Sequence, residues 1–193
     1  MEGVTELRIA SALSTTKDTT LAVEETAKEL KAKLGQTPNL VLAFVSHHHG
    51  PNFEPVAFGL CDALGTDHLL GCTGESIVGG DQEIEGKPAL SVWAACLPQA
   101  TVERMHLNFA MTPEGGSFSG WSEKLPETWD EDALFLLLGE PFTFPADQLL
   151  QRLNEDHPGV RVVGGMASGG RAEGQNRLLF GRRELASGAI AVY

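Results

Sequence analysis

Apolar and polar positions in the first part of the chain follow a strand spacing and then a helix spacing. Residues 7–13 alternate between apolar and polar side chains, which is typical of a half-buried strand. Apolar residues then recur at spacings of four, three and four between residues 23 and 34, after a polar cap at Asp18 or Thr19 and before Gly35. This pattern predicts a helix with one apolar stripe and a cap at each end.

Nearly continuous apolar runs predict buried strands further along the chain. Residues 40–45 and 89–97 are apolar almost throughout, as expected of strands that are covered on both faces. Between them the pattern favours a helix at about residues 54–64 and a strand at 69–70 that enters a glycine-rich turn at residues 71–74. The alternation of helices and strands predicts an α/β fold.

The second half of the chain repeats this order of elements. It offers an apolar strand at residues 133–138, an amphipathic helix at 146–153, a short strand at 160–163 that also enters glycine, and a final strand at 188–193. A shift of 93 residues lays residues 40–45 over residues 133–138. The sequence therefore predicts two copies of strand, helix, strand, glycine-rich loop and strand.

These two copies define the expected domain organisation. We place them at about residues 38–98 and 131–193, joined by a linker strand and loop at residues 99–130. Two copies of one unit normally bury their apolar faces against each other around a pseudo-twofold axis. We therefore expect residues 1–193 to form one α/β domain, with mixed β-sheet layers and helices on the faces. The pattern leaves open whether the sheets form one continuous layer or pack face to face.

Charge narrows the range of partners. The chain has 14 basic and 26 acidic residues, which give a formal net charge of −12 at pH 7. Because this charge repels phosphate backbones and anionic lipids, we expect neither nucleic acid nor a membrane as a partner.

Residues 1–6 lack the basic and apolar segments of a secretory signal, and no apolar stretch is long enough to span a bilayer. The expected compartment is the cytoplasm.

Cysteine and histidine positions raise two chemical alternatives. The three cysteines are too widely spaced for a disulfide framework or a C-x-x-C site, so we expect reduced, buried thiols. The histidine triplet at residues 47–49 has no third metal ligand at a familiar spacing, so we expect a solvated strand-end loop or a pocket rim, and no metal. A nucleophilic Cys72 with a base from this triplet is an enzymatic alternative, although no third group orients the pair. Nucleotide motifs are absent, and no cofactor is expected.

Two glycine segments, residues 71–80 and 164–174, form the candidate ligand site. Each follows a strand whose carboxyl end should lie at a sheet edge, where ligands of α/β proteins bind. Their glycines would allow backbone N–H groups to converge on a carboxylate or phosphate oxygen. Glu75 could receive an ammonium group and Arg171 a carboxylate, as in an amino acid. The alternative is that these segments are hairpin turns without a ligand. The candidate ligand-binding residues are Cys72, Thr73, Gly74, Glu75, Ser76, Gly165, Met166, Ala167, Ser168, Gly169, Gly170 and Arg171.

Several motifs in and around these segments resemble the amino-terminal half of the FIST domain family. The motifs are Val41-Leu42-Ala43-Phe44-Val45-Ser46, Gly71-Cys72-Thr73-Gly74-Glu75-Ser76-Ile77-Val78-Gly79-Gly80, and Val162-Val163-Gly164-Gly165-Met166-Ala167-Ser168-Gly169-Gly170. The resemblance extends from about residue 11 to the end of the chain. It implies a sensory domain that binds small molecules such as amino acids and occurs alone or beside signalling modules. It also implies a carboxy-terminal FIST half, which we expect to be absent here, and no catalytic residue set.

Three functional hypotheses follow from these observations. The first is a small-ligand-binding sensory module of intracellular signalling, not an enzyme, whose partners are a small polar ligand and the carboxy-terminal FIST half or signalling modules. The second is a ligand-free interaction scaffold, which would be favoured if Trp121 and Trp129 were exposed in an apolar patch. The third is an enzyme that uses Cys72 with a nearby histidine.

Overall fold

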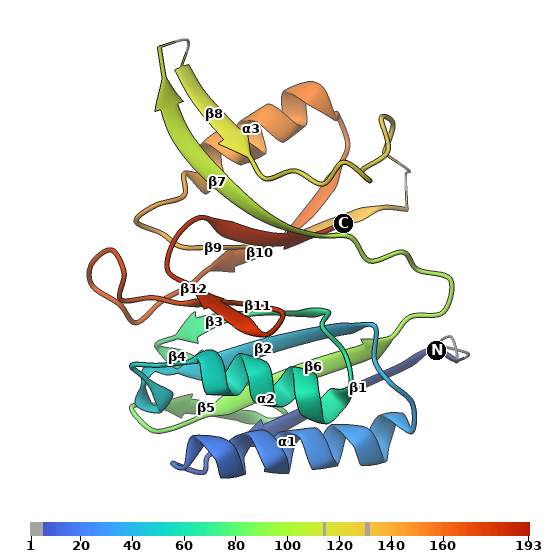
Figure 1. Ribbon diagram of the computed structural model, residues 1–193, viewed down its shortest axis with the longest axis vertical. Coiled ribbons are helices and arrows are strands. Elements are labelled where there is room, and N and C mark those ends of the chain that lie inside the picture. Colours follow the sequence, from blue (N-terminus) through green and yellow to red (C-terminus); the bar gives the residue numbers. More distant parts are fainter. Residues whose placement is uncertain (1–5, 114, 130–131) are drawn as a thin grey trace.

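Four layers of secondary structure are stacked in the computed structural model, which describes residues 6–113, 115–129 and 132–193 (Figure 1). Two helices cover one face of a six-stranded sheet, a five-stranded sheet lies against its other face, and a third helix lies on the far side of the second sheet. The mixed α/β class expected from the sequence is confirmed. The first residues, in which no secretory signal was found, and the expected boundary at residues 130–131 lie outside the described residues.

The first sheet and its helices are built from the elements with the clearest sequence signals. Helix α1 begins where the Asp18 carboxylate accepts a hydrogen bond from the Leu21 N–H at 3.0 Å, and it ends at Gly35, whose φ is 65°. The helices are α1 (Thr19–Leu34) and α2 (Glu54–Leu64). The strand order is β1 (Arg8–Ser14), β6 (Leu90–Cys96), β2 (Leu40–Ser46), β3 (Leu69–Gly74), β11 (Leu178–Phe180) and β12 (Arg183–Leu185).

The second sheet is built mainly from the later part of the chain. Its helix is α3 (Ala146–Asp156). Its strand order is β10 (Arg161–Met166), β9 (Leu134–Gly139), β13 (Ala189–Val192), β7 (Arg104–Thr112) and β8 (Gly115–Ser119). Two small elements lie beside the first sheet: a 3₁₀ turn at His47–His49 after β2, and a hairpin of β4 (Ser76–Gly79) and β5 (Gln82–Glu85).

The two sheets share a common strand pattern. In the first sheet β2 pairs in parallel with β3 and antiparallel with β6, which in turn pairs antiparallel with β1. In the second sheet β9 pairs in parallel with β10 and antiparallel with β13, which in turn pairs antiparallel with β7. A duplicated unit would give this arrangement; the duplication itself stays a prediction.

The sheets pack face to face, which is the point that the sequence left open. A core cluster between them includes Leu40 and Leu70 from the first sheet and Leu138, Ile190 and Val192 from the second. Separate clusters lie between the first sheet and helices α1 and α2, and between the second sheet and α3. The carboxyl ends of the parallel pairs β2–β3 and β9–β10 therefore meet across the interface between the sheets.

Several short strands differ from the sequence expectations. The strand expected within the linker at residues 99–130 corresponds to β7, but β7 and the unpredicted β8 are both integral strands of the second sheet. The hairpin β11–β12 was not predicted, and it adds to the first sheet by antiparallel pairing with β3. Strand β10 continues to Met166, and α3 continues to Asp156, each three residues beyond its expected end. The added residues of β10 pair with residues 137–139 of β9, whereas the added residues of α3 are exposed and make contacts one turn back, such as the Arg152–Asp156 ion pair.

Candidate functional site

An apolar chamber with a volume of about 460 Å³ opens between the two sheets, at the carboxyl ends of their parallel strands. Strands β2 and β3 and the hairpin strand β4 contribute one wall, and β9 and β10 contribute the other. This volume falls within the range of about 300–1,000 Å³ that is typical of small-molecule pockets. The apolar side chains that line it are Leu42, Phe44, Ile77, Val78, Leu136, Leu138 and Met166.

The two glycine segments meet beside this chamber through Ser168. The Ser168 N–H donates to the carbonyl oxygen of Thr73 at 3.0 Å, and the Ser168 hydroxyl accepts a hydrogen bond from the Glu75 N–H at 3.1 Å. His47 Nε2 donates to the carbonyl oxygen of Ser168 at 2.9 Å. Gly169 lies so close to the His47 ring that a Cβ there would approach its Cδ2 to 2.4 Å. The segments are therefore joined directly, as a shared site requires.

A more polar hollow, here called the vestibule, adjoins the chamber. It has a volume of about 640 Å³ and shares Gly74 and Ser76 with the chamber lining. Its remaining lining residues are His47, His48, Glu75, Glu85, Gly86 and Gly169. The expectation that the histidine triplet forms a pocket rim is confirmed for His47 and His48. The third histidine, His49, is buried, and its Nδ1 lies 3.1 Å from the Thr19 hydroxyl.

The local structure of the glycine segments corrects one expectation. Both segments begin as strand: residues 71–74 belong to β3 and residues 164–166 to β10. Backbone N–H groups expected to converge on an anion already have acceptors within the protein. Besides Glu75 and Ser168, the N–H of Thr73 donates to the Arg177 carbonyl, that of Gly170 to Asn176 Oδ1, and that of Arg171 to Gln175 Oε1. An anion nest is therefore not formed at these positions.

The structure divides the predicted site residues into three groups. Seven line the chamber, among them Ser76 and Ser168; Glu75 and Gly169 line the vestibule; and three line neither hollow. The chamber group is Cys72, Thr73, Gly74, Ser76, Gly165, Met166 and Ser168. Ala167, Gly170 and Arg171 form the third group, and Arg171 is exposed. The predicted pairing of Glu75 with an ammonium group and Arg171 with a carboxylate therefore does not converge on one hollow.

Sequence reasoning missed the apolar side chains of the chamber. Leu42, Phe44, Leu136 and Leu138 were assigned to buried strands, and their positions two residues apart place each pair on one face of its strand. This two-residue spacing is the sequence signal that could have identified the chamber residues. It shows which residues share a face of each strand, but it does not show which face contacts the other sheet.

Cys72 does not have the environment of a nucleophile. Burial between the sheets raises the pKa of its thiol to about 12, so the thiol stays protonated at neutral pH. Among the described residues, no hydrogen bond joins Cys72 to a histidine, and His47 is engaged with Ser168. These contacts give no support to the enzymatic alternative. The described residues also contain no cluster of three or more His, Cys, Asp or Glu side chains placed to hold a metal ion.

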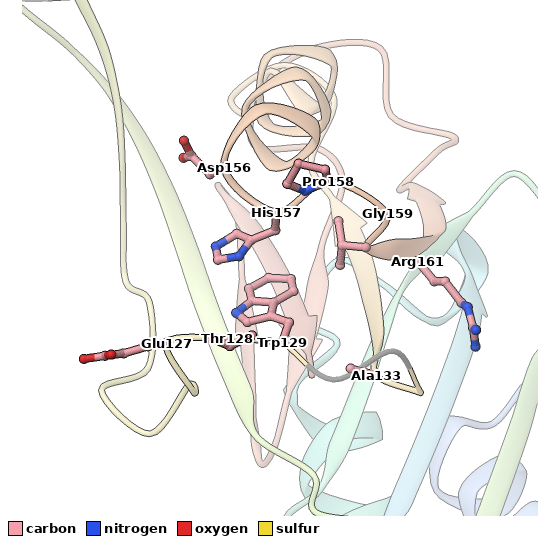
Figure 2. A pocket seen from close by; sticks show the side chains of 10 residues that line it. Glu127, Thr128, Trp129, Ala133, Asp156, His157, Pro158, Gly159 and Arg161 are labelled. Atoms are coloured by element: carbon pink, nitrogen blue, oxygen red, sulfur yellow. The ribbon is translucent and has the colours of Figure 1, made fainter.

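The two tryptophans on which the scaffold hypothesis depends, Trp121 and Trp129, pack against the second core. Trp129 stacks on His157 with ring centroids 4.3 Å apart, and both Trp129 and Trp121 contact the buried Phe135 ring. A hollow of about 560 Å³ lies beside this stack (Figure 2). Its charged side chains, Glu127, Asp156 and Arg161, point in different directions in Figure 2 and do not converge. Both tryptophan rings are half-buried, and together with Phe118, Leu125 and Leu153 they line a second hollow of about 420 Å³.

Comparison with known proteins gives one family and several relatives. The sequence profile of the FIST N domain matches residues 39–193. Uncharacterized protein MT0656 of Mycobacterium tuberculosis is 36% identical over 189 residues, which cover 96% of this chain and 47% of that protein. Uncharacterized protein Mb0898c of Mycobacterium bovis is 34% identical over 189 residues with the same coverage. The chain thus spans about half the length of these relatives. Within the described part of the chain, every helix is too short or too polar to cross a bilayer.

Proposed function

Because this chain belongs to the FIST N domain family, a family of sensory-type domains, we propose that it is a small-ligand-binding sensory module. The ligand would occupy the chamber between the sheets, bounded by the two glycine segments. The observation that carries this proposal is the direct contact of the segments, through Ser168, at the mouth of an apolar hollow of ligand size. We propose binding and not catalysis, because Cys72 is buried between the sheets and His47, a candidate base on the vestibule, is engaged with the Ser168 carbonyl.

We place this function in intracellular signal transduction, within a longer protein of the kind seen among the relatives. Ligand in the chamber would contact both sheets, since Leu42 and Leu136 line opposite walls. Binding would therefore favour one spacing of the sheets over others and alter how the domain docks on a carboxy-terminal FIST half or a signalling module. For an amino acid, the site offers Glu75 to the ammonium group but no lysine or arginine to the carboxylate among its described lining residues, so we propose that amino acids bind more weakly than amines.

A substitution at Gly165 tests whether the ligand binds in the chamber. It pairs with Leu138 on the chamber side of β10, and a Cβ built there meets no heavy atom within 4 Å. Gly165→Leu should therefore fill the chamber without displacing the protein around it. The matched control is Val163→Leu, which enlarges an exposed side chain two residues earlier on the same face of β10, at a position that does not line the chamber.

The experiment is a thermal-shift screen of the purified chain against amino acids, amines, alcohols and small carboxylic acids. A ligand of the folded state raises the melting temperature in a dose-dependent way. We expect such a rise in the parent and in Val163→Leu, and its loss in Gly165→Leu. A screen without any stabilising compound, or a rise that persists in a folded Gly165→Leu variant, would contradict a site in this chamber.

A further inference from the structure

The chamber and the vestibule together indicate the chemical class of ligand. We infer that the site takes an amphipathic amine, with an aliphatic or aromatic body in the chamber and a cationic ammonium group in the vestibule beside Glu75 and Glu85. This inference rests on the proposed function, because it requires that the chamber binds a small molecule. It goes further by fixing which end of the ligand lies where.

The lining of the chamber selects the body of the ligand. Leucine, isoleucine, valine, phenylalanine and methionine side chains provide most of its walls, and its polar lining includes the side chains of Thr73, Ser76 and Ser168. The Thr73 hydroxyl already accepts a hydrogen bond from the Arg177 N–H, and the Ser168 hydroxyl accepts one from the Glu75 N–H. A strongly polar ligand would lose its hydration here without gaining enough partners. An apolar group gains free energy in proportion to the area it buries.

The vestibule selects the charge of the head group. Glu75 and Glu85 line it, both side chains are exposed, and the hairpin holds Glu85 beside Ser76, whose hydroxyl lies 3.5 Å from Glu85 Oε1. Because Gly74 and Ser76 line both hollows, a ligand whose body fills the chamber reaches the vestibule at its polar end. Two carboxylates near that end attract a cation and repel an anion.

The same neighbourhood offers an anionic head group little. Neither hollow has a lysine or arginine among its described lining residues, and Arg171 lies outside both. The backbone N–H groups of Thr73, Glu75 and Ser168 already donate within the protein. The formal net charge of −12 adds a general bias toward cations. A carboxylate ligand would therefore meet two like charges and no free backbone donor at these three positions, with the His48 ring of the vestibule lining as a side-chain donor.

The test compares three ligands that differ only in the head group: 3-phenylpropylamine, 3-phenylpropanol and 3-phenylpropanoate, together with the octyl series of the same three groups. Binding is measured by calorimetry at low salt. We expect the amine to bind about fivefold more tightly than the alcohol, since exposed ion pairs are weak, and the carboxylate to bind most weakly. Raising the salt concentration should reduce the difference between amine and alcohol, because the carboxylates are exposed.

Charge-removing variants assign the preference to the vestibule. Glu75→Gln combined with Glu85→Gln should bring the amine to within about twofold of the alcohol, measured on the same variant. The matched control, Glu83→Gln, removes an exposed charge from the same strand outside the vestibule and should keep the amine preference.

The results distinguish failure of the amine assignment from failure of the chamber as a ligand site. If the alcohol or the carboxylate binds as tightly as the amine, and Gly165→Leu abolishes that binding, the chamber is a ligand site and the amine assignment is wrong. If none of the six compounds binds, or if their binding survives in Gly165→Leu, the amine assignment and this use of the chamber both fail.

Discussion

Adjacent glycines on β10 have different structural requirements. At Gly164 the backbone has a φ of 149°, and a Cβ would lie 1.8 Å from the carbonyl oxygen of Leu137 on β9. Gly71 stands in the same relation to Ala43 in the first sheet, where the corresponding distance is 2.2 Å. At Gly165 a Cβ would extend into the open chamber. Gly164 is thus needed for the close approach of two strands, and Gly165 for the volume of the site.

This difference predicts that alanine substitutions at the two positions have unequal effects on the free energy of unfolding. Gly164→Ala forces the paired strands apart and should lower the free energy of unfolding by about 1–3 kcal/mol. Gly165→Ala should change it by less than about 0.5 kcal/mol, because the added methyl group contacts nothing. Urea denaturation of the two variants measures both values. Equal destabilisation by the two substitutions would refute the distinction.

The sequence identified the polar and glycine residues of the site more readily than its apolar ones. The segments containing Cys72–Ser76 and Gly165–Gly169 stand out by composition alone, and the structure brings them together. Leu136 and Leu138 could not be assigned to the site from the sequence, because their place in the chamber depends on which face of β9 packs against the other sheet. Arg171 was placed in the site by its charge, but the direction of the chain after Gly169 is set by contacts with residues distant from the loop.

At the scale of elements, those contacts form a buried polar network under the second glycine segment. Asn176, which is fully buried, donates from Nδ2 to Glu140 Oε1 at 3.1 Å and accepts the Gly170 N–H on Oδ1 at 2.8 Å. Glu140, also fully buried, accepts hydrogen bonds on Oε2 from the Phe142 N–H and the Thr143 hydroxyl. The loop between β10 and β11 is therefore fixed to the end of β9.

Removing the central amide of this network should destabilise and loosen the loop. Asn176→Ala leaves the Gly170 N–H and Glu140 Oε1 without this partner, and we expect the free energy of unfolding to fall by about 1–3 kcal/mol. Hydrogen–deuterium exchange should accelerate at Gly170. The control is Gln175→Ala, because its exposed side chain accepts the Arg171 N–H within the same loop and makes no hydrogen bond to Glu140 among the described residues. Unchanged exchange at Gly170 in Asn176→Ala would count against this role of the network.

Helices whose capping residues and apolar periodicity lie within or next to the element were predicted well. Short strands that form only by pairing with residues distant in sequence were not. Helix α2 has the predicted bounds, and α1 is fixed by Asp18 and Gly35, which lie next to it in sequence. Strands β11 and β12 contain three residues each and belong to the first sheet because β11 pairs with β3 and β12 pairs with β11. So short a segment carries almost no periodic signal of its own.

At the scale of the whole molecule, the core between the sheets couples the two halves of the fold. Fully buried Leu178 and Ile190 belong to this cluster together with Leu70 from the first sheet. Neither sheet can separate from the other without exposing these side chains to water. We therefore predict that the chain unfolds as one cooperative domain.

The tryptophans allow a direct measurement of this cooperativity. Trp93 packs against the core between the sheets from β6, whereas Trp121 and Trp129 pack against the second core. Fluorescence of a Trp93→Phe variant reports on the second core, and that of a Trp121→Phe, Trp129→Phe variant reports on the first sheet. After correction for each variant's stability by circular dichroism, both should give the same urea midpoint as the backbone signal. Two separate midpoints within one variant would indicate independent halves.

The loop between β10 and β11 has a mechanical consequence that follows from its attachments. Its first end continues from β10 in the second sheet, and its other end enters β11 in the first sheet. The loop thus works as a tether whose span equals the offset between the two sheets at that place. Any displacement of one sheet relative to the other therefore changes the distance between the two ends of this loop, and the loop backbone must change its conformation. Since Ser168 lies on it and lines the chamber, motion of the sheets and the shape of the chamber are geometrically linked.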